Sequence, residues 1–247
     1  LVAKKVNKIL VNNKNIAYGV EMENGDTIFA KQIVSSVGIY NTFKKLITKP
    51  KITKYYDNIF NNIQQSVSHI YMFVKLKGTP QELQLRSSNI WNWPNKDYDK
   101  MLSDFYNDPL KAPMPFFMGF SCAKDLTWTE RYPEHSNAII LTMGNTKDFE
   151  KWEHEKCMKR SQDYKDLKEK YAQRLLEEAL FKFYPHLRDK VLHYDVATPL
   201  STQHYLNSYE GEPYGLQTNK YRYLQATNLT PKTPVNNLFL TGQDICS

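Results

Sequence analysis

A glycine and a carboxylate stand close together near the end of the chain, in a setting that suits a hydroxyl-rich ligand. The apolar residues 238–240 are bounded by Asn237 on one side and Thr241-Gly242 on the other, a pattern typical of a short buried strand. Gly242 allows a sharp turn or a close approach to a ligand. Asp244 then lies past the carboxyl end of the strand, where open α/β sheets bind ligands, and its carboxylate can accept hydrogen bonds from a ribose-like or ribityl hydroxyl. A turn in which Asp244 caps a following helix has the same pattern.

A second corner of this kind closes the third apolar stretch of the chain. Residues 33–38 read Ile-Val-Ser-Ser-Val-Gly, an apolar run that ends on small residues. At Gly38 the backbone can lie against a cofactor, although an ordinary strand end has the same composition. If both corners serve one cofactor, the segment Ser36–Gly38 must lie beside the segment Gly242–Asp244. Corners on opposite sides of the molecule would exclude a shared site.

Several other kinds of chemistry have no motif in these residues. The chain has no G-x-G-x-x-G and no G-x-x-x-x-G-K-[ST], so it does not encode a glycine-rich phosphate cradle. The six histidines show no H-x-x-x-H or H-E-x-x-H spacing, and we expect no metal site. A G-x-S-x-G element is also absent. Cys122, Cys157 and Cys246 are far apart in sequence, and we interpret them as free thiols in a reducing compartment.

The composition is that of a globular protein with a basic surface. The 247 residues are 41% apolar, enough for a sizeable core in one or two domains. The net charge of +7 favours an anionic membrane surface or a nucleic acid without identifying either. No apolar run reaches the roughly 18 residues that span a bilayer. Because the sequence opens on Leu1 and stops just after a strand and turn, we expect it to be a segment of a longer protein.

The first part of the sequence predicts a small β unit followed by helical turns. We expect strands over residues 6–11, 17–23 and 27–35, with the turn between the last two at Asn24-Gly25, a strong hairpin signal. Residues 39–65 are polar and have the character of helical turns.

The middle of the sequence predicts further strands and one clear helix. Strands are expected over residues 66–76, 89–93, 115–120, 138–143 and 191–196. Residues 148–160 suggest a solvated helix. Apolar residues recur every three or four positions from Tyr164 to Phe183, which predicts a helix that begins near Ser161 or Asp163 and ends at Pro185. The Pro- and Gly-containing residues 198–215 are expected to form loops before the closing strand.

This order of elements predicts a mixed α/β fold, a Rossmann-like nucleotide domain with a second domain inserted into it. We assign residues 1–38 and 198–247 to the first domain and residues 39–197 to a substrate domain of β-sheet and helices. Aromatic strand residues are candidate walls of a pocket for an apolar ligand, or else plain core: Trp91, Trp93, Phe116 and Phe117.

Four blocks of sequence together resemble the all-trans-retinol 13,14-reductase (retinol saturase) family, within the larger group of carotenoid isomerases, phytoene desaturases and related FAD-dependent oxidoreductases. The resemblance runs nearly end to end. The block that distinguishes retinol saturases from the wider group is Ser121-Cys-Ala-Lys-Asp-Leu-Thr-Trp-Thr-Glu-Arg-Tyr-Pro133. The other three blocks are residues 34–43, 198–206 and 237–245.

The resemblance implies an FAD enzyme that reduces the 13,14 double bond of all-trans-retinol at the endoplasmic reticulum membrane, with NAD(P)H as a possible electron donor. The family likeness assigns FAD contacts to Ser36, Val37, Gly38, Thr241, Gly242, Gln243 and Asp244. It also implies a glycine-rich βαβ unit that these residues lack, so we expect the isolated chain to bind FAD poorly. No catalytic residue is assigned. Tyr205, Tyr214 and His204 lie near the return to the first domain and are candidates for the substrate pocket or for proton donation.

Two alternatives remain. A polyene isomerase or desaturase of the same flavoprotein group would share every block except the most specific one. A basic module that binds nucleic acid or a membrane surface would need clustered basic faces, whereas the lysines here are diffuse and mixed with Glu and Asp. We therefore expect a small apolar polyene as the ligand, contact with a membrane surface, and no nucleic acid.

Overall fold

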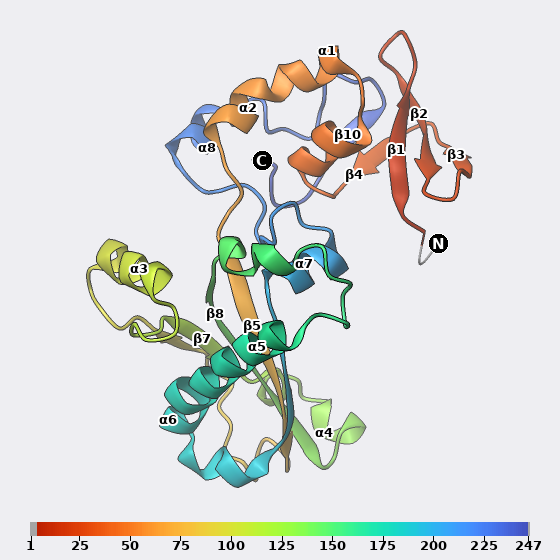
Figure 1. Ribbon diagram of the computed structural model, residues 1–247. Coiled ribbons are helices and arrows are strands. Elements are labelled where there is room, and N and C mark those ends of the chain that lie inside the picture. The colour runs from red at the N-terminus through yellow and green to blue at the C-terminus, as the bar shows by residue number, and fades with distance from the viewer. Residues whose placement is uncertain (1–3, 247) are drawn as a thin grey trace. The chain divides into compact units, whose positions relative to one another are not determined.

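The computed structural model describes residues 4–246, which form two compact units (Figure 1). Unit 1 contains residues 4–67 and 206–246, and unit 2 contains residues 68–205. The sequence had suggested limits at 38/39 and 197/198. The limits differ because the helical turns of residues 41–62 share one core with the strands of unit 1.

Unit 1 begins with an antiparallel meander of three strands in the order β1-β2-β3. Its strands are β1 (Val6–Val11), β2 (Ala17–Met22) and β3 (Thr27–Phe29). Gly25 has a φ of +86° in the turn between β2 and β3, the conformation for which the Asn-Gly pair was expected.

A separate two-stranded sheet of unit 1 joins distant parts of the chain. β4 (Ile33–Ser35) pairs in parallel with β10 (Leu238–Leu240). The prediction of one continuous strand over residues 27–35 was therefore wrong, since β3 and β4 belong to different sheets. Ile33 and Ser35 are buried and the Ile33 amide donates to the Asn237 carbonyl at 2.8 Å, whereas β3 is exposed along its length. Burial against β10 thus separates β4 from the hairpin.

Short helical elements complete unit 1. They are a π-helical turn (Asn41–Leu46), α1 (Pro50–Thr53), a 3₁₀ turn (Lys54–Tyr56), α2 (Asp57–Asn62) and α8 (Lys220–Leu224). Pro50 begins α1 at a position where its missing N–H costs nothing. The fully buried rings of Phe43 and Tyr56 stack at 3.9 Å in the core that these turns share with β4 and β10.

Unit 2 is built on an antiparallel five-stranded sheet in the order β6-β7-β8-β5-β9. Its strands are β5 (Ser68–Lys77), β6 (Ile90–Asn92), β7 (Phe116–Gly119), β8 (His135–Gly144) and β9 (Val191–Ala197). All five were predicted. Their ends shift by one to three residues, which is common because strand ends depend on pairing partners that sequence does not reveal.

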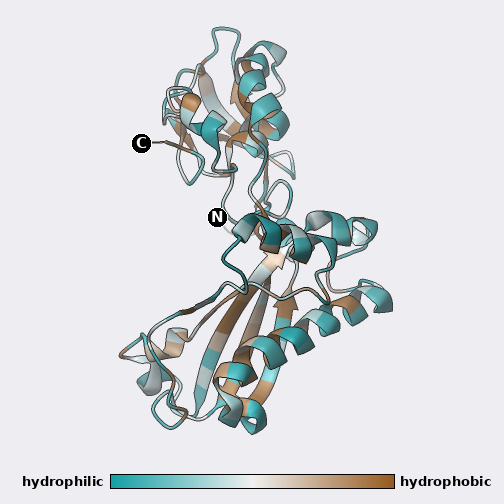
Figure 2. Ribbon diagram, turned by 90° about the vertical axis from the view of Figure 1, so that its left-hand side faces the viewer, coloured by the Kyte–Doolittle hydropathy of each residue, from teal (hydrophilic) through white to brown (hydrophobic). Residues whose placement is uncertain are grey.

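The long amphipathic helix of unit 2 covers one face of this sheet (Figures 1 and 2). It comprises α5 (Gln162–Leu175), a π-helical turn (Leu176–Leu180) and α6 (Phe181–Phe183), as the periodicity had indicated. Its buried residues Tyr171 and Leu175 pack with Met72 and Ile140 of the sheet. The remaining helices are α3 (Tyr98–Asn107), α4 (Trp128–Arg131) and α7 (Pro199–Leu206).

All three of these helices lie where no helix was expected. α3 is capped by Asp97, whose side chain accepts from the Lys100 amide at 3.0 Å, and an Asp at this position is a common start signal for a helix. α7 begins at Pro199 within residues expected to form a loop. A proline at a helix start is as compatible with a helix as with a loop. The predicted solvated helix at residues 148–160 is a 3₁₀ turn (Thr146–Trp152) followed by irregular chain.

The described residues give no sign of a membrane-spanning helix or a metal centre. Within residues 4–246, each helix is too short or too polar to cross a bilayer. No group of three His, Cys, Asp or Glu side chains in the same range could hold a metal ion.

Candidate functional site

The two corners singled out in the sequence lie side by side in unit 1. Ser35 pairs with Leu240 at the carboxyl ends of β4 and β10, and the Thr241 amide donates to the Ser35 carbonyl at 2.9 Å. A Cβ placed on Gly242 would lie 3.7 Å from the Ser36 carbonyl oxygen. Parallel pairing brings both turns to the same edge of the sheet, so the condition for a shared site is met.

The buried Asp244 carboxylate links the chain segments at this edge by hydrogen bonds. Its side chain is 4% exposed. Oδ2 accepts from the Ile39 amide at 2.8 Å, and Oδ1 accepts from the Leu216 amide, also at 2.8 Å. The carboxylate therefore joins its own turn to the segments of Ile39 and Leu216, which lie 205 and 28 residues earlier in the chain. Each oxygen still has lone-pair capacity for a ligand hydroxyl.

Two glycines make room for the Asp244 carboxylate. Gly38 has a φ of +84°, and a Cβ there would lie 3.0 Å from Oδ2. Gly215 has a φ of +64°, and a Cβ there would lie only 2.0 Å from Oδ1. Both positions have a left-handed backbone, which favours glycine. The contact at Gly215 leaves no room for a side chain, and the contact at Gly38 leaves room for one only if the Asp244 carboxylate shifts. The sequence identified Gly38 but gave no signal for Gly215, because its contact depends on the return of the chain through residues 206–216.

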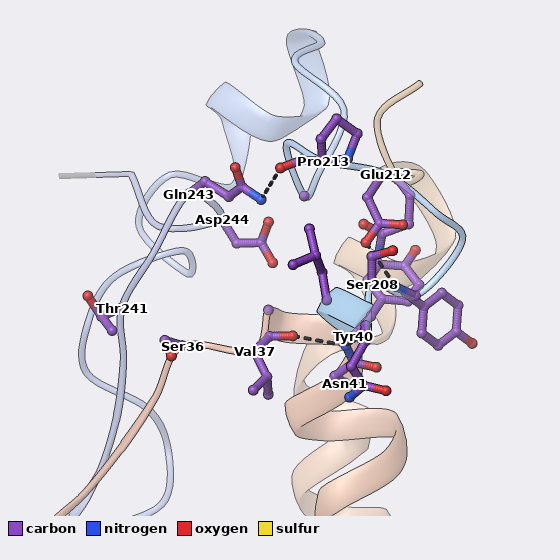
Figure 3. Close-up of a pocket in the computed structure, with 16 residues that line it drawn as sticks. Ser36, Val37, Tyr40, Asn41, Ser208, Glu212, Pro213, Thr241, Gln243 and Asp244 are labelled. Atoms are coloured by element: carbon purple, nitrogen blue, oxygen red, sulfur yellow. Dashed lines mark hydrogen bonds between the residues drawn. The ribbon is translucent and has the colours of Figure 1, made fainter. Parts of the chain in front are cut away.

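A cavity of about 140 Å³ opens at this edge (Figure 3). Six of the residues to which the sequence assigned FAD contacts line it, while the seventh, Gly242, lies in the turn beside it: Ser36, Val37, Gly38, Thr241, Gln243 and Asp244. The sequence analysis did not identify its other polar walls, Tyr40, Asn41, Ser208 and Glu212. Its volume admits part of a dinucleotide, such as a polyhydroxyl chain, but not a whole one.

Two polar atoms of the cavity wall have no partner within the described chain. Asn41 Oδ1 and Ser208 Oγ are buried and make no hydrogen bond there, although the Asn41 amide nitrogen donates to the carbonyls of Val37 and Asn207 at 3.0 and 2.8 Å. Burying a polar atom without a partner is costly. Asn41 and Ser208 both belong to the cavity wall, and an unpartnered acceptor and hydroxyl in this wall suit a ligand with hydroxyl groups.

Burial also shifts two titratable groups at the cavity. Burial raises the pKa of the Glu212 carboxyl, against the opposing effect of backbone amides, including those of Tyr209 and Glu210 at 2.9 and 2.6 Å. The pKa of the Tyr40 hydroxyl rises to about 12, chiefly through burial and secondarily through nearby acidic groups. That hydroxyl donates to the Ile63 carbonyl at 2.8 Å. Tyr40 is thus a neutral structural donor at neutral pH.

The aromatic candidates of unit 2 divide between the two faces of its sheet. Trp91 is 63% exposed and packs edge-on against Phe117 with ring centroids 4.8 Å apart, and Trp93 stacks on Trp91. Phe116 points to the opposite face and is buried in the core at 5% exposure. Of the two alternatives stated for Phe116, its position is that of a core residue, because successive residues of a strand face opposite sides.

The face that carries Trp91 lies opposite the α5 side of the sheet. It is apolar around Trp91 and polar farther along β5, where Lys75 pairs with Asn137 and His193. Cross-strand pairing aligns one row across all five strands, and alternate positions extend it. Residues of this face remain partly or largely exposed (Figure 2 shows the hydropathy of the strands). The row is Trp91, Phe117, Leu141, Tyr71 and Ala197, and its extension includes Phe73 and Ile139. We call this surface the open face of unit 2.

The remaining candidates do not line the cavity of unit 1. Tyr214 follows Pro213 in the wall but is itself 59% exposed. His204 is exposed on α7. Tyr205 is 65% exposed and borders a different cavity within unit 2.

Comparison with known proteins identifies curated relatives over nearly the whole chain. An all-trans-retinol 13,14-reductase of Danio rerio is 34% identical over 99% of this chain and 42% of its own length. An inactive all-trans-retinol 13,14-reductase of the same organism is 30% identical, with the same shares covered. A chloroplastic prolycopene isomerase of Daucus carota is 24% identical over 81% of this chain and 29% of its own length. The chain is thus a relative of proteins named all-trans-retinol 13,14-reductase, and it spans less than half the length of those relatives.

One solved structure supports the fold. An oxidoreductase from Methanosarcina mazei superposes with a TM-score of 0.50 and 14% sequence identity, over 98% of this chain and 44% of that protein. No protein-family profile matches the chain. The mixed α/β fold expected from the sequence is confirmed.

Proposed function

We propose that this relative of the all-trans-retinol 13,14-reductases is part of an FAD-dependent oxidoreductase that reduces the 13,14 double bond of all-trans-retinol to all-trans-13,14-dihydroretinol. The sequence similarity over 99% of the chain supports the reaction. The observation that carries the cofactor assignment is the pairing of β4 with β10, which sets the Ser36–Gly38 and Gly242–Asp244 turns at one sheet edge.

The cavity of unit 1 fits a flavin's polyhydroxyl chain in its chemistry. Asp244 has remaining acceptor capacity, and Asn41 Oδ1 and Ser208 Oγ are buried polar atoms without partners in the described chain. Gly38 and Gly242 keep the backbone free of side chains at both turns. When bound, the flavin supplies hydride transfer to the polyene. NAD(P)H is the electron donor that we propose for it.

The open face of unit 2 supports the choice of an apolar polyene as the substrate. Trp91, Trp93 and Phe117 offer flat rings to an extended conjugated chain, and Leu141 and Ile139 extend the apolar surface across β8. Such a surface shields one side of a bound polyene from water and orients it, which is the protein's contribution to a cofactor-driven reduction. We propose these residues as the polyene-binding surface.

We place the protein at the surface of the endoplasmic reticulum membrane, where retinol partitions. The net charge of +7 supports attraction to an anionic leaflet. This location follows the resemblance stated for the sequence.

A second function, isomerisation of a polyene, is favoured by the similarity to prolycopene isomerase. It uses the same flavin and the same apolar surface, but its product has the mass of its substrate. The similarity to an inactive reductase further requires that activity be measured on this protein directly.

The full-length protein that contains this chain tests the proposal. Purified from cells, it should show flavin absorbance and convert all-trans-retinol to a product two hydrogens heavier when NADPH and a suitable reductase are present. A product of unchanged mass would identify the isomerase instead. A folded protein without flavin, which cannot be reconstituted with FAD, would refute both.

A paired substitution tests the cavity of unit 1. Ser208→Ala removes a buried hydroxyl that has no partner in the described chain, so the fold should be unaffected and FAD affinity should fall roughly tenfold, the value of one hydrogen bond. Ser103→Ala, in exposed α3, is the control and should leave FAD affinity unchanged. Equal FAD affinity in both variants would remove Ser208 from the cofactor site.

A further inference from the structure

Unit 2 contains a second cavity with a buried cation in its wall. The cavity has a volume of about 450 Å³, which lies in the range of small-molecule sites. It borders the edge strand β9 and the start of α5, and its walls include Phe73, Arg160, Tyr164, Ala197 and Tyr205. All of these residues belong to unit 2.

Arg160 is the unusual member of this wall. Its side chain is 8% exposed, yet no carboxylate of the described residues lies within ion-pairing distance of its guanidinium. Nη1 donates a hydrogen bond to the Tyr164 hydroxyl at 3.4 Å, and the guanidinium lies 4.9 Å from the centre of that ring. Nε is buried and has no partner in the described part of the chain. Most of the five N–H groups of this side chain therefore lack a strong acceptor.

The charges around Arg160 do not neutralise it. The acidic residue of the wall, Asp195, is already paired with Lys168 at 3.2 Å and accepts from the Val196 amide at 2.8 Å. Lys165 adds a further positive charge at the exposed rim. A buried charge without a partner is costly, and an anion that enters the cavity removes that cost.

The cavity also continues onto the open face of unit 2. Phe73 and Ala197 line the cavity. Ala197 pairs with Tyr71 of the row, and Phe73 pairs with Ile139 of its extension on one side and with Asp195 on the other. A ligand whose charged end lies at Arg160 can therefore rest its apolar part on Phe73 and Tyr71. One buried guanidinium matches one carboxylate, in charge and in its paired hydrogen-bonding geometry.

We propose that this cavity binds the carboxylate of an apolar acid, with Arg160 as its anion-binding residue and the open face as the support of its hydrocarbon chain. The site lies within unit 2 and does not depend on a flavin. The proposed site predicts that the protein binds an apolar carboxylic acid more tightly than the alcohol with the same hydrocarbon chain.

Fluorescence titration with cis-parinaric acid, an 18-carbon conjugated polyene acid, and with the corresponding alcohol tests this site in the full-length protein. The wild type should bind the acid at least about tenfold more tightly than the alcohol, since charge-assisted hydrogen bonds are the stronger class. Equal affinities, or no binding of the acid, would overturn the proposal without any variant. That result would leave the flavin assignment of unit 1 untouched.

Variants then assign the preference to one residue. Arg160→Gln should abolish the preference for the acid while leaving alcohol affinity within about twofold, and Arg160→Lys should retain part of it, because it keeps the charge but loses the planar fork. Arg86→Gln makes the same change at an exposed arginine of unit 2 and should retain the full preference. A preference for the acid that persists in folded Arg160→Gln would overturn the role of Arg160.

Discussion

At the scale of single residues, the strongest constraint is the pair of glycines around Asp244. Gly215→Ala places a methyl group 2.0 Å from the Asp244 carboxylate and adds strain at a φ of +64°. We expect unit 1 to lose about 3 kcal/mol of unfolding free energy, from strain and a broken charged hydrogen bond. Urea unfolding followed by circular dichroism measures this loss.

Gly25→Ala is the matched control for that change. Gly25 has a φ of +86°, but nothing lies within 4 Å of an added Cβ. It should cost only about 1 kcal/mol, the penalty for a left-handed alanine. Equal losses in the two variants would show that the Asp244 contact does not constrain Gly215.

Glu212 should make unit 1 less stable as the pH rises. Burial raises its pKa above the ordinary 4.5, so the folded state binds the proton more tightly than the unfolded state does. The stability that Glu212 contributes is present below about pH 4.5 and is lost as the pH rises through the folded-state pKa. Glu212→Gln should therefore gain stability relative to wild type between pH 4 and pH 7 in urea titrations. A difference between the two proteins that is constant with pH would contradict the shift.

At the scale of elements, the sequence revealed more of the strands than of the helices. Alternation and β-branched residues predicted the five strands of unit 2, because strand patterns are local. The break between β3 and β4 could not be predicted from sequence, since it depends on pairing of β4 with β10 about 205 residues later. Asp244 was identifiable because Gly-Gln-Asp after a strand is a local pattern. Glu212 and Ser208 were not, because a loop brings them to the cavity.

Truncating a side chain should have different effects on the two faces of β6 and β7. On the buried face it should lower stability, and on the open face it should lower retinol affinity. Phe116→Ala leaves a hole in the core and should cost about 3–5 kcal/mol of unfolding free energy. Trp91→Ala removes a ring that is 63% exposed, so its cost should stay within about 1 kcal/mol while retinol affinity of the full-length protein falls. Circular dichroism and a retinol titration measure both effects. Normal retinol affinity in Trp91→Ala would exclude the open face as the polyene surface.

At the scale of the whole molecule, two separate hydrophobic cores predict two unfolding transitions. All four tryptophans, at positions 91, 93, 128 and 152, lie in unit 2, so tryptophan fluorescence reports on that unit. Gly215→Ala should shift the circular dichroism transition of unit 1 and leave the fluorescence midpoint unchanged. Phe116→Ala should shift the fluorescence midpoint. Coincident shifts in both probes for both variants would mean that the chain unfolds as one cooperative body.

The parallel pairing of β4 with β10 has a consequence for biosynthesis. During translation, Ser35 leaves the ribosome 205 residues before its partner Leu240 exists. At a translation rate of about 5–20 residues per second, β4 remains without its pairing partner β10 for roughly 10–40 s, while all of unit 2 is synthesised. Its unpaired backbone is exposed to other nascent chains during that interval, so the yield of correctly assembled protein should depend on chaperones that shield residues 33–35 until the end of synthesis.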